Sequence, residues 1–197
     1  MRLCGPAVGA YLEAMTVLPW ATPRPSSLAL AREVAFPAAA AVVITLSSDM
    51  RMPLGLPGHR GLVWLTLLVA VALTARRPQT VRAVGAVSTA ATVLLQSGPG
   101  LWAGVRYLGA ATFLYLLTTS PAVQSRRWLV ALAAAPIHLV ALAVPIATGL
   151  IGGHHAAVVG VGDKALFHLG FGLVAGILGW AIAAAIDWAT PETSRGA

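Results

Sequence analysis

The chain has 197 residues, of which 58% are hydrophobic and only 10% are charged, and its formal net charge is +7. A soluble domain needs roughly a quarter of its residues charged to cover its surface, so this composition excludes an ordinary soluble protein and predicts a membrane protein. The basic residues stand in short clusters between apolar runs, without the interleaved aromatic residues of a nucleic-acid groove, so no nucleic acid is expected as a partner.

Residues 1–30 hold a weak apolar run that is broken by Glu13 and Pro19 and followed by no clear cleavage site, so we expect a retained interfacial segment. Six apolar stretches follow, each near the length of about 20 residues that crosses a bilayer. They cover residues 33–48, 61–75, 82–96, 101–119, 128–151 and 164–188. The sequence therefore predicts an all-α membrane protein, with a bundle of six transmembrane helices over residues 31–190 and a short tail at 191–197.

The arginines between these stretches predict the orientation. Arg76, Arg77 and Arg82 separate the second stretch from the third, and Arg126 and Arg127 separate the fourth from the fifth. Because short cytoplasmic loops are enriched in arginine and lysine, both connections are expected in the cytoplasm, and an even number of spans places both termini there too. The lack of asparagine and the abundance of alanine and arginine indicate a bacterial coding sequence. We therefore expect a multi-pass protein of the bacterial cytoplasmic (inner) membrane.

The three connections on the other side are rich in glycine and proline, and they read RMPLGLPGHRG, SGPGLWAG and GGHHAAVVGVGDK. Irregular backbone near a membrane is tolerated only where protein or a watery cavity satisfies its amides, so we expect a polar pocket that opens outward. In the first connection, prolines and glycines shape a turn that presents His59 and Arg60 ahead of Trp64.

Polar residues inside the stretches are costly in lipid and mark candidate ligand contacts. Arg106, beside Tyr107, and His168 each lie about one turn inside a helix end, whereas His138 lies within the fifth stretch, towards its inner side. The structural alternatives are a snorkelling arginine and histidines bonded to a neighbouring carbonyl. The predicted substrate-binding residues are His59, Arg60, Trp64, Gln96, Trp102, Arg106, Tyr107, His154, His155, Asp163, Lys164 and His168. Their arginines and lysine suit a carboxylate or phosphate, and their tryptophans suit apolar walls.

Small residues recur at helical spacing in the first and last stretches. Ala31, Ala35 and Ala39 share one face of the first stretch, and the last stretch holds a ladder formed by Gly172, Gly176, Gly179 and Ala183. Such residues let two helix backbones approach closely, which is the main way helices associate in lipid. Packing inside one bundle is the simpler interpretation for each ladder. Contact with another subunit is the alternative, and the first stretch is the better candidate for it.

Six helices in about 200 residues, a shaped first outer loop and an alanine ladder on the first helix together resemble the substrate-binding (S) components of energy-coupling factor (ECF) transporters. The resemblance implies that the first outer loop closes over a vitamin-like ligand. It also implies that Ala31, Ala35 and Ala39 dock against a transmembrane coupling subunit, whose two ATPase subunits drive transport. The chain has no G-x-x-x-x-G-K-[ST] loop of its own, as expected for a passive receptor that needs no cofactor or resident metal.

Within that family the nearest local similarity is to biotin-type components, which carry a PLG-x-x-P turn in the first loop. Pro53, Leu54, Gly55 and Pro57 are similar to that turn, with one residue fewer before the second proline, but the following residues read GHRGLVW instead of a Thr/Gln-rich sequence. In addition, Asp163 and Lys164 are adjacent, whereas that family spaces its acid and lysine. Biotin is therefore not supported, and the expected ligand is a small anionic or ring-bearing vitamin.

Two other functions remain open. The segment FHLGFGLVAGILGW resembles the last helix of rhomboid intramembrane proteases, which would make Ser97 the nucleophile and His168 its base. The His-xxx-Asn of their second helix and a G-x-S-G around the serine are both absent. A nickel or cobalt permease would use His154, His155 and His168, although they have no carboxylate-rich or cysteine-rich companion.

Overall fold

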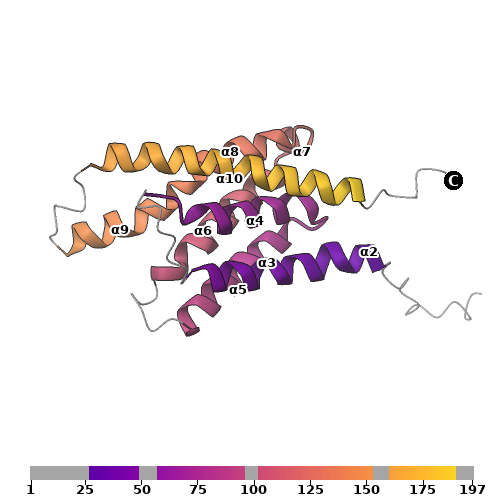
Figure 1. The fold of residues 1–197 in the computed structure, drawn as a ribbon, viewed down its shortest axis with the longest axis horizontal. Helices are drawn as coiled ribbons and strands as arrows, with labels where there is room; N and C mark the ends of the chain where they lie inside the picture. The colour runs from indigo at the N-terminus through magenta and orange to yellow at the C-terminus, as the bar shows by residue number, and fades with distance from the viewer. Residues whose placement is uncertain (1–26, 49–56, 96–101, 153–159, 190–197) are drawn as a thin grey trace, which may run out of the picture.

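The computed structural model describes residues 27–48, 57–95, 102–152 and 160–189, and the regular structure in these ranges is entirely helical. The elements are α2 (Ser27–Leu30), the π-helical turn η1 (Ala31–Ala35), α3 (Phe36–Ser47), α4 (Gly61–Thr74), α5 (Gln79–Leu95), α6 (Trp102–Thr119), α7 (Pro121–Gln124), α8 (Trp128–His138), α9 (Val140–Ile151) and α10 (Val161–Ala189). The predicted all-α class is confirmed for these ranges. Most of the long helices run along the long axis of the molecule (Figure 1).

Each of the six predicted apolar stretches is mainly helical over its described residues. Two helical runs in the described ranges, Trp128–Ile151 and Val161–Ala189, are long and apolar enough to cross a membrane. The helix α4 is equally apolar but has only 14 residues. At 1.5 Å per residue it is roughly 21 Å long, less than the hydrocarbon core of about 30 Å. A helix this short and apolar is suited to the inside of a bundle.

The helix α4 lies at the centre of the molecule. It packs against α10, α3, α6, α5 and α8. Its buried residues leave no polar face, because Trp64, Leu65 and Thr66 are buried in succession and are followed by the buried run 68–71. A helix that is apolar all round is stable only when it is covered on all sides. The other contacts build the bundle around it, with α10 beside α8, α5 beside α6, and α3 against α5.

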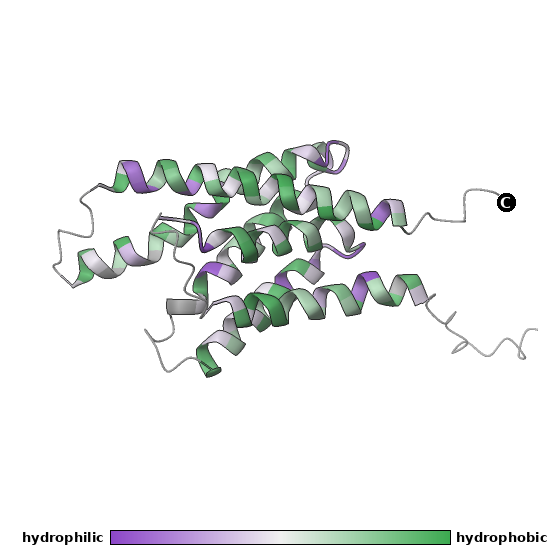
Figure 2. Cartoon of the chain, viewed as in Figure 1, coloured by the Kyte–Doolittle hydropathy of each residue, from purple (hydrophilic) through white to green (hydrophobic). Residues whose placement is uncertain are grey.

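The outward faces of the surrounding helices are apolar. Val42, Val43 and Leu46 of α3 are exposed, as are Ile177, Leu178 and other large apolar side chains of α10. Figure 2 shows the more hydrophilic residues mainly near helix ends and in the turns. An apolar belt with polar ends is the surface expected of helices that face lipid.

The glycine ladder of α10 packs inside the chain. A Cβ on Gly176 would lie 2.0 Å from the carbonyl oxygen of Ala131, and one on Gly172 would lie 2.7 Å from that of Ala134. Gly179 meets α4 in the same way, 2.7 Å from the carbonyl oxygen of Thr66. The simpler interpretation is therefore confirmed for this ladder. The alanine ladder of the first stretch differs, because Ala31, Ala35 and Ala39 are all exposed.

Candidate functional site

The first turns of α4 are surrounded by aromatic and histidine rings from three other helices. Trp64 meets the ring of Tyr107 on α6 at a centroid distance of 5.6 Å and the ring of His138 on α8 at 5.5 Å, both edge to face. The rings of His138 and His168 on α10 are 4.8 Å apart. All four side chains are buried. We call these four residues, together with Arg106, the histidine cluster.

The hydrogen bonds of the two histidines fix their tautomers. Nδ1 of His138 lies 2.9 Å from the carbonyl oxygen of His168, and Nδ1 of His168 lies 2.8 Å from that of Lys164. A carbonyl oxygen only accepts, so each Nδ1 carries a proton and donates. Nε2 of His138 lies against the backbone of Gly61, so Nε2 of His168 is the ring nitrogen that remains for a hydrogen bond with a ligand.

The position of the His138 ring depends on Gly61, the first residue of α4. A Cβ at this position would lie 1.7 Å from Nε2 of His138. No Cβ approaches another atom so closely, so any side chain here would displace the imidazole. A glycine at the start of α4 is thus what allows the ring to lie against the helix backbone.

The turn before α4 packs directly on the histidine cluster. Gly58 has a φ of 90°, and its carbonyl accepts a hydrogen bond of 2.9 Å from the backbone N–H of Gly61. This left-handed conformation is one that glycine adopts without strain. A Cβ on Gly58 would lie 3.1 Å from Nδ1 of His168. Within the same turn His59 is buried and Arg60 is exposed, so the end of the first connection forms a shaped turn over α10, as predicted.

Arg106 brings a cation to the cluster. Its Nη2 donates a hydrogen bond of 2.9 Å to the hydroxyl of Tyr107, and its guanidinium carbon lies 4.9 Å from the centre of that ring. Its buried Nε has no hydrogen-bond partner among the described residues. A buried donor without a partner costs about 1–3 kcal/mol, so an anion placed there would be strongly favoured.

Two hydroxyls inside the bundle were not foreseen. Ser88 and Thr92 lie one turn apart on the buried face of α5, both fully buried, and neither hydroxyl has a hydrogen-bond partner in the described ranges. Such groups are normally paired with protein or with ordered water, so they mark a place where water or a ligand group would be stabilised. Their spacing of four, which places both on one face of α5, is the sequence signal that could have revealed them.

The structure brings together several of the predicted contacts. Trp64, Arg106, Tyr107 and His168 meet in the histidine cluster, and His59 lies in the turn beside it. Asp163 is exposed in the first turn of α10. Lys164 contacts the cluster through its backbone carbonyl, which accepts the hydrogen bond from His168. The side chains of Gln96, Trp102, His154 and His155, and the alternative nucleophile Ser97, lie outside the described residues.

His138 was not among the predicted substrate-binding residues, yet its ring also reaches the histidine cluster. The fifth stretch is interrupted at Leu139, so that α8 ends at His138 after 11 residues of a 24-residue run. The end of α8 thereby brings His138 against Gly61 and Trp64 in the first turn of α4. The cluster combines this break in the fifth stretch with residues from the first turns of α4, α6 and α10.

The opposite end of α4 carries ions in place of rings. Asp187, near the end of α10, accepts hydrogen bonds from Nη2 of Arg32 at 2.5 Å and from Nη1 of Arg127 at 2.7 Å. Nη2 of Arg127 also donates to the carbonyl of Leu73 in the last turn of α4. We call Arg32, Arg127 and Asp187 the arginine clasp. The clasp joins η1, α8, α10 and α4, and it was not predicted.

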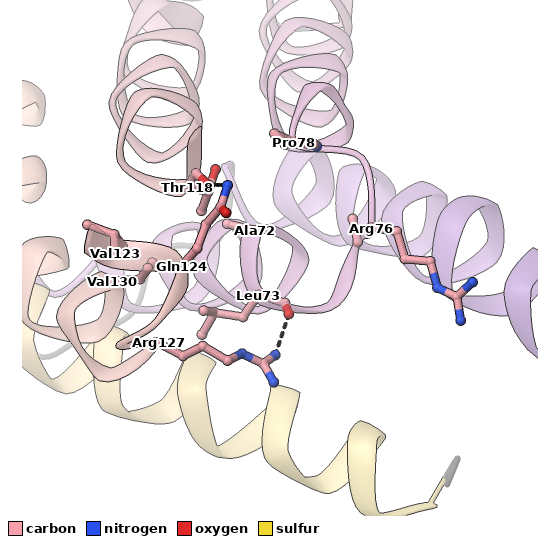
Figure 3. A pocket seen from close by; sticks show the side chains of 10 residues that line it. Ala72, Leu73, Arg76, Pro78, Thr118, Val123, Gln124, Arg127 and Val130 are labelled. Carbon is pink, nitrogen blue, oxygen red and sulfur yellow. Dashed lines mark hydrogen bonds between the residues drawn. The ribbon is translucent and has the colours of Figure 1, made fainter. Parts of the chain in front are cut away.

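A cavity of about 330 Å³ lies beside the arginine clasp (Figure 3). It is lined by Ala72, Leu73, Ala75, Arg76, Pro78, Thr118, Val123, Gln124, Arg127 and Val130. The predicted pocket was instead placed between the glycine-rich connections at the other end. Most residues of those connections lie outside the described ranges, so that prediction stays open.

In the part of the chain that the structure describes, no group of three or more His, Cys, Asp or Glu side chains is placed to hold a metal ion. No protein-family model matches the chain, and the searches of curated proteins and of solved structures also find no match.

Proposed function

We propose that the chain is a substrate-capture protein of a bacterial cytoplasmic membrane, with six spans and both termini in the cytoplasm. It binds a small anionic, vitamin-like ligand from outside and hands it inward with an ATP-driven partner module of the ECF type. The observation that carries the proposal is the convergence of Trp64, Arg106, Tyr107 and His168 from three helices beneath the turn that ends the first connection.

The distribution of arginines supports this orientation. Arg76 and Arg77 follow α4, and Arg126 and Arg127 precede α8. The clasp shows that Arg127, Arg32 and the end of α10 meet at the same end of the bundle. Cytoplasmic ends are rich in arginine, so this end faces inward and the histidine cluster opens towards the other side. The exposed apolar faces of α3 and α10 then lie in lipid.

The chemistry of the cluster supports an anionic ligand. A carboxylate or phosphate would accept a charge-assisted hydrogen bond from the unpaired Nε of Arg106. The Nε2 lone pair of His168 would accept from a ligand hydroxyl or amide, while Trp64 and Tyr107 provide aromatic walls. Binding would order the first connection over the ligand, because the turn at Gly58 already rests on His168.

The surface of the first helical run supports a docking partner. Ala31, Ala35 and Ala39 remain exposed, whereas the comparable ladder on α10 is used inside the bundle. A flat stripe of small residues allows a second helix to approach closely in lipid. We assign it to a transmembrane coupling subunit that carries two ATPase subunits.

Native mass spectrometry of the chain purified from its host membrane tests the ligand directly. We expect a bound anionic molecule of small mass, which Arg106→Ala or Arg60→Ala releases while the protein stays folded. Arg82→Ala is the matched control, because Arg82 lies over the ring of Tyr115 and not over that of Tyr107 in the histidine cluster. Wild-type protein that carries nickel or cobalt, and no organic anion, would contradict the proposal in favour of a metal permease.

The docking assignment has a separate test. Ala35→Leu is expected to spare ligand binding and to abolish co-purification of the coupling subunit. The matched control is Val42→Leu on the exposed face of α3. If transport in cells survives Ala35→Leu, the alanine ladder is not the docking surface.

A further inference from the structure

The cavity beside the arginine clasp combines a cation with apolar walls. Figure 3 shows Arg127 running along one side of it towards Leu73, while Gln124 lies beside Thr118. The Gln124 side-chain N–H donates to the Thr118 carbonyl at 3.1 Å. Val123, Val130, Ala72 and Leu73 supply apolar walls, and Ala75, Arg76 and Pro78 complete the lining. The cavity thus has a polar side next to an apolar surface.

The surroundings of the cavity are positively charged. This end of the bundle has two carboxylates, Glu33 and Asp187, and six arginines among the described residues, namely Arg32, Arg76, Arg77, Arg82, Arg126 and Arg127. Arg32 and Arg127 share the carboxylate of Asp187, so the three residues of the clasp together carry a net positive charge. The two hydrogen bonds of Arg127 also use only two of the five N–H groups of its guanidinium.

In the proposed membrane orientation, the cavity lies at the level of the lipid headgroups. Its walls come from the last turn of α4, the end of α6, the short helix α7 and the start of α8. Helix ends next to arginine-rich turns lie at the membrane interface, and basic pockets between transmembrane helices on the cytoplasmic side bind anionic headgroups. A water-soluble phosphate compound would satisfy Arg127 but would gain nothing from the apolar walls.

We propose that this cavity binds the headgroup phosphate of an anionic phospholipid, with Arg127 as the cation, Gln124 as a neutral donor and Val123 and Val130 against the glycerol and upper acyl chains. This inference rests on the membrane orientation given under the proposed function. It does not depend on the ligand proposed for the histidine cluster.

Native mass spectrometry of the full chain in mixed micelles tests it, with phosphatidylglycerol and phosphatidylcholine as probes. Arg127→Gln is expected to weaken phosphatidylglycerol binding about fivefold, since a basic residue near an anionic headgroup contributes about 1 kcal/mol. Asp187 keeps Arg32 as its partner in this variant, so no carboxylate is left alone. Val123→Trp fills the cavity without changing the charge and is expected to weaken binding at least as much.

Arg82→Gln is the matched control, because it removes an arginine from the same end without touching the cavity. Equal losses in Arg82→Gln and Arg127→Gln would show diffuse attraction and overturn the site. Unchanged binding in Val123→Trp would also overturn it. If glycerol 3-phosphate displaces phosphatidylglycerol at similar concentration, the natural occupant is a soluble phosphate compound and not a lipid.

Discussion

The two ends of α4 hold their polar groups in different ways. At the first turns the polar atoms belong to rings packed edge to face, and each histidine donates to a backbone carbonyl. At the last turn they belong to charged side chains from η1, α8 and α10, which share the carboxylate of Asp187. Side-chain volume therefore controls the geometry of the histidine cluster, whereas charge controls that of the arginine clasp. Substitutions of size and of charge should therefore act at opposite ends.

The largest effect is expected on α10, because it contributes to both ends. Gly176→Leu places a side chain against the backbone oxygen of Ala131, which cannot move without separating α10 from α8. Overpacking of this kind costs about 3 kcal/mol or more, so little folded protein should remain in a detergent stability assay. Gly170→Leu is the control, because a Cβ there meets nothing within 4 Å. Similar losses in both variants would mean that leucine itself, and not the packing of α10, is harmful.

The second largest effect is expected at Gly61, where side-chain volume controls the histidine cluster. Gly61→Ala should lower the free energy of unfolding by about 1–3 kcal/mol, because its Cβ would overlap the His138 ring. His138→Ala in the same chain should recover part of this loss, as expected for residues in contact. Gly162→Ala, in open space, serves as the control. Additive losses in the double variant would show that the position of the His138 ring does not depend on Gly61.

At the arginine clasp, charge should matter more than volume. Asp187→Asn keeps the shape but removes the charge that two arginines share. The side chains are 14% to 47% exposed, so the expected loss of stability is about 1–2 kcal/mol, between the values for surface and buried ion pairs. A double-mutant cycle with Arg32→Gln measures the coupling, and Arg126→Gln is a control outside the clasp. Zero coupling between Arg32 and Asp187 would show that their ion pair does not stabilise the protein.

The smallest effect concerns the middle of α4, between the two ends. The hydroxyl of Thr66 donates to the carbonyl of Ala175 on α10 at 3.3 Å. Hydrogen bonds between helices in membranes contribute about 0.6 kcal/mol on average, so Thr66→Val should shift unfolding by about that amount. Thr112→Val is the comparison, since Thr112 bonds only to its own helix. A loss of several kcal/mol in the free energy of unfolding would contradict the expectation that polar contacts matter little in the middle of α4.

The helices themselves could be predicted from the sequence because apolar runs and arginine-rich breaks are local signals. The ranges of α4, α6 and α10 differ from the predicted stretches by only a few residues. The extension of the first helix through η1 and the interruption at Leu139 were missed, because no glycine marks either feature. Two prolines, Pro136 and Pro145, do lie close to that interruption.

The candidate site was only partly predictable. Arg106, Tyr107 and His168 were found because each is a polar residue in an apolar helix, which is costly wherever it lies. The arginine clasp could not be found in this way, because Arg32 and Asp187 are 155 positions apart and each lies at a helix end where charges are common. The contacts of His138 with Gly61, Trp64 and His168 join residues far apart in the chain, which only the packing of the bundle reveals.

The central claim is that the two ends of α4 face opposite sides of one membrane. Substituted-cysteine labelling tests it most directly, in a chain whose single cysteine is removed by Cys4→Ala. Gly162→Cys reports the exposed start of α10 near the histidine cluster, and Arg126→Cys reports the exposed turn before α8. We predict that a membrane-impermeant maleimide labels position 162 in intact cells and position 126 only after the cells are permeabilised. Labelling of both positions in intact cells, or of neither until permeabilisation, would contradict the account.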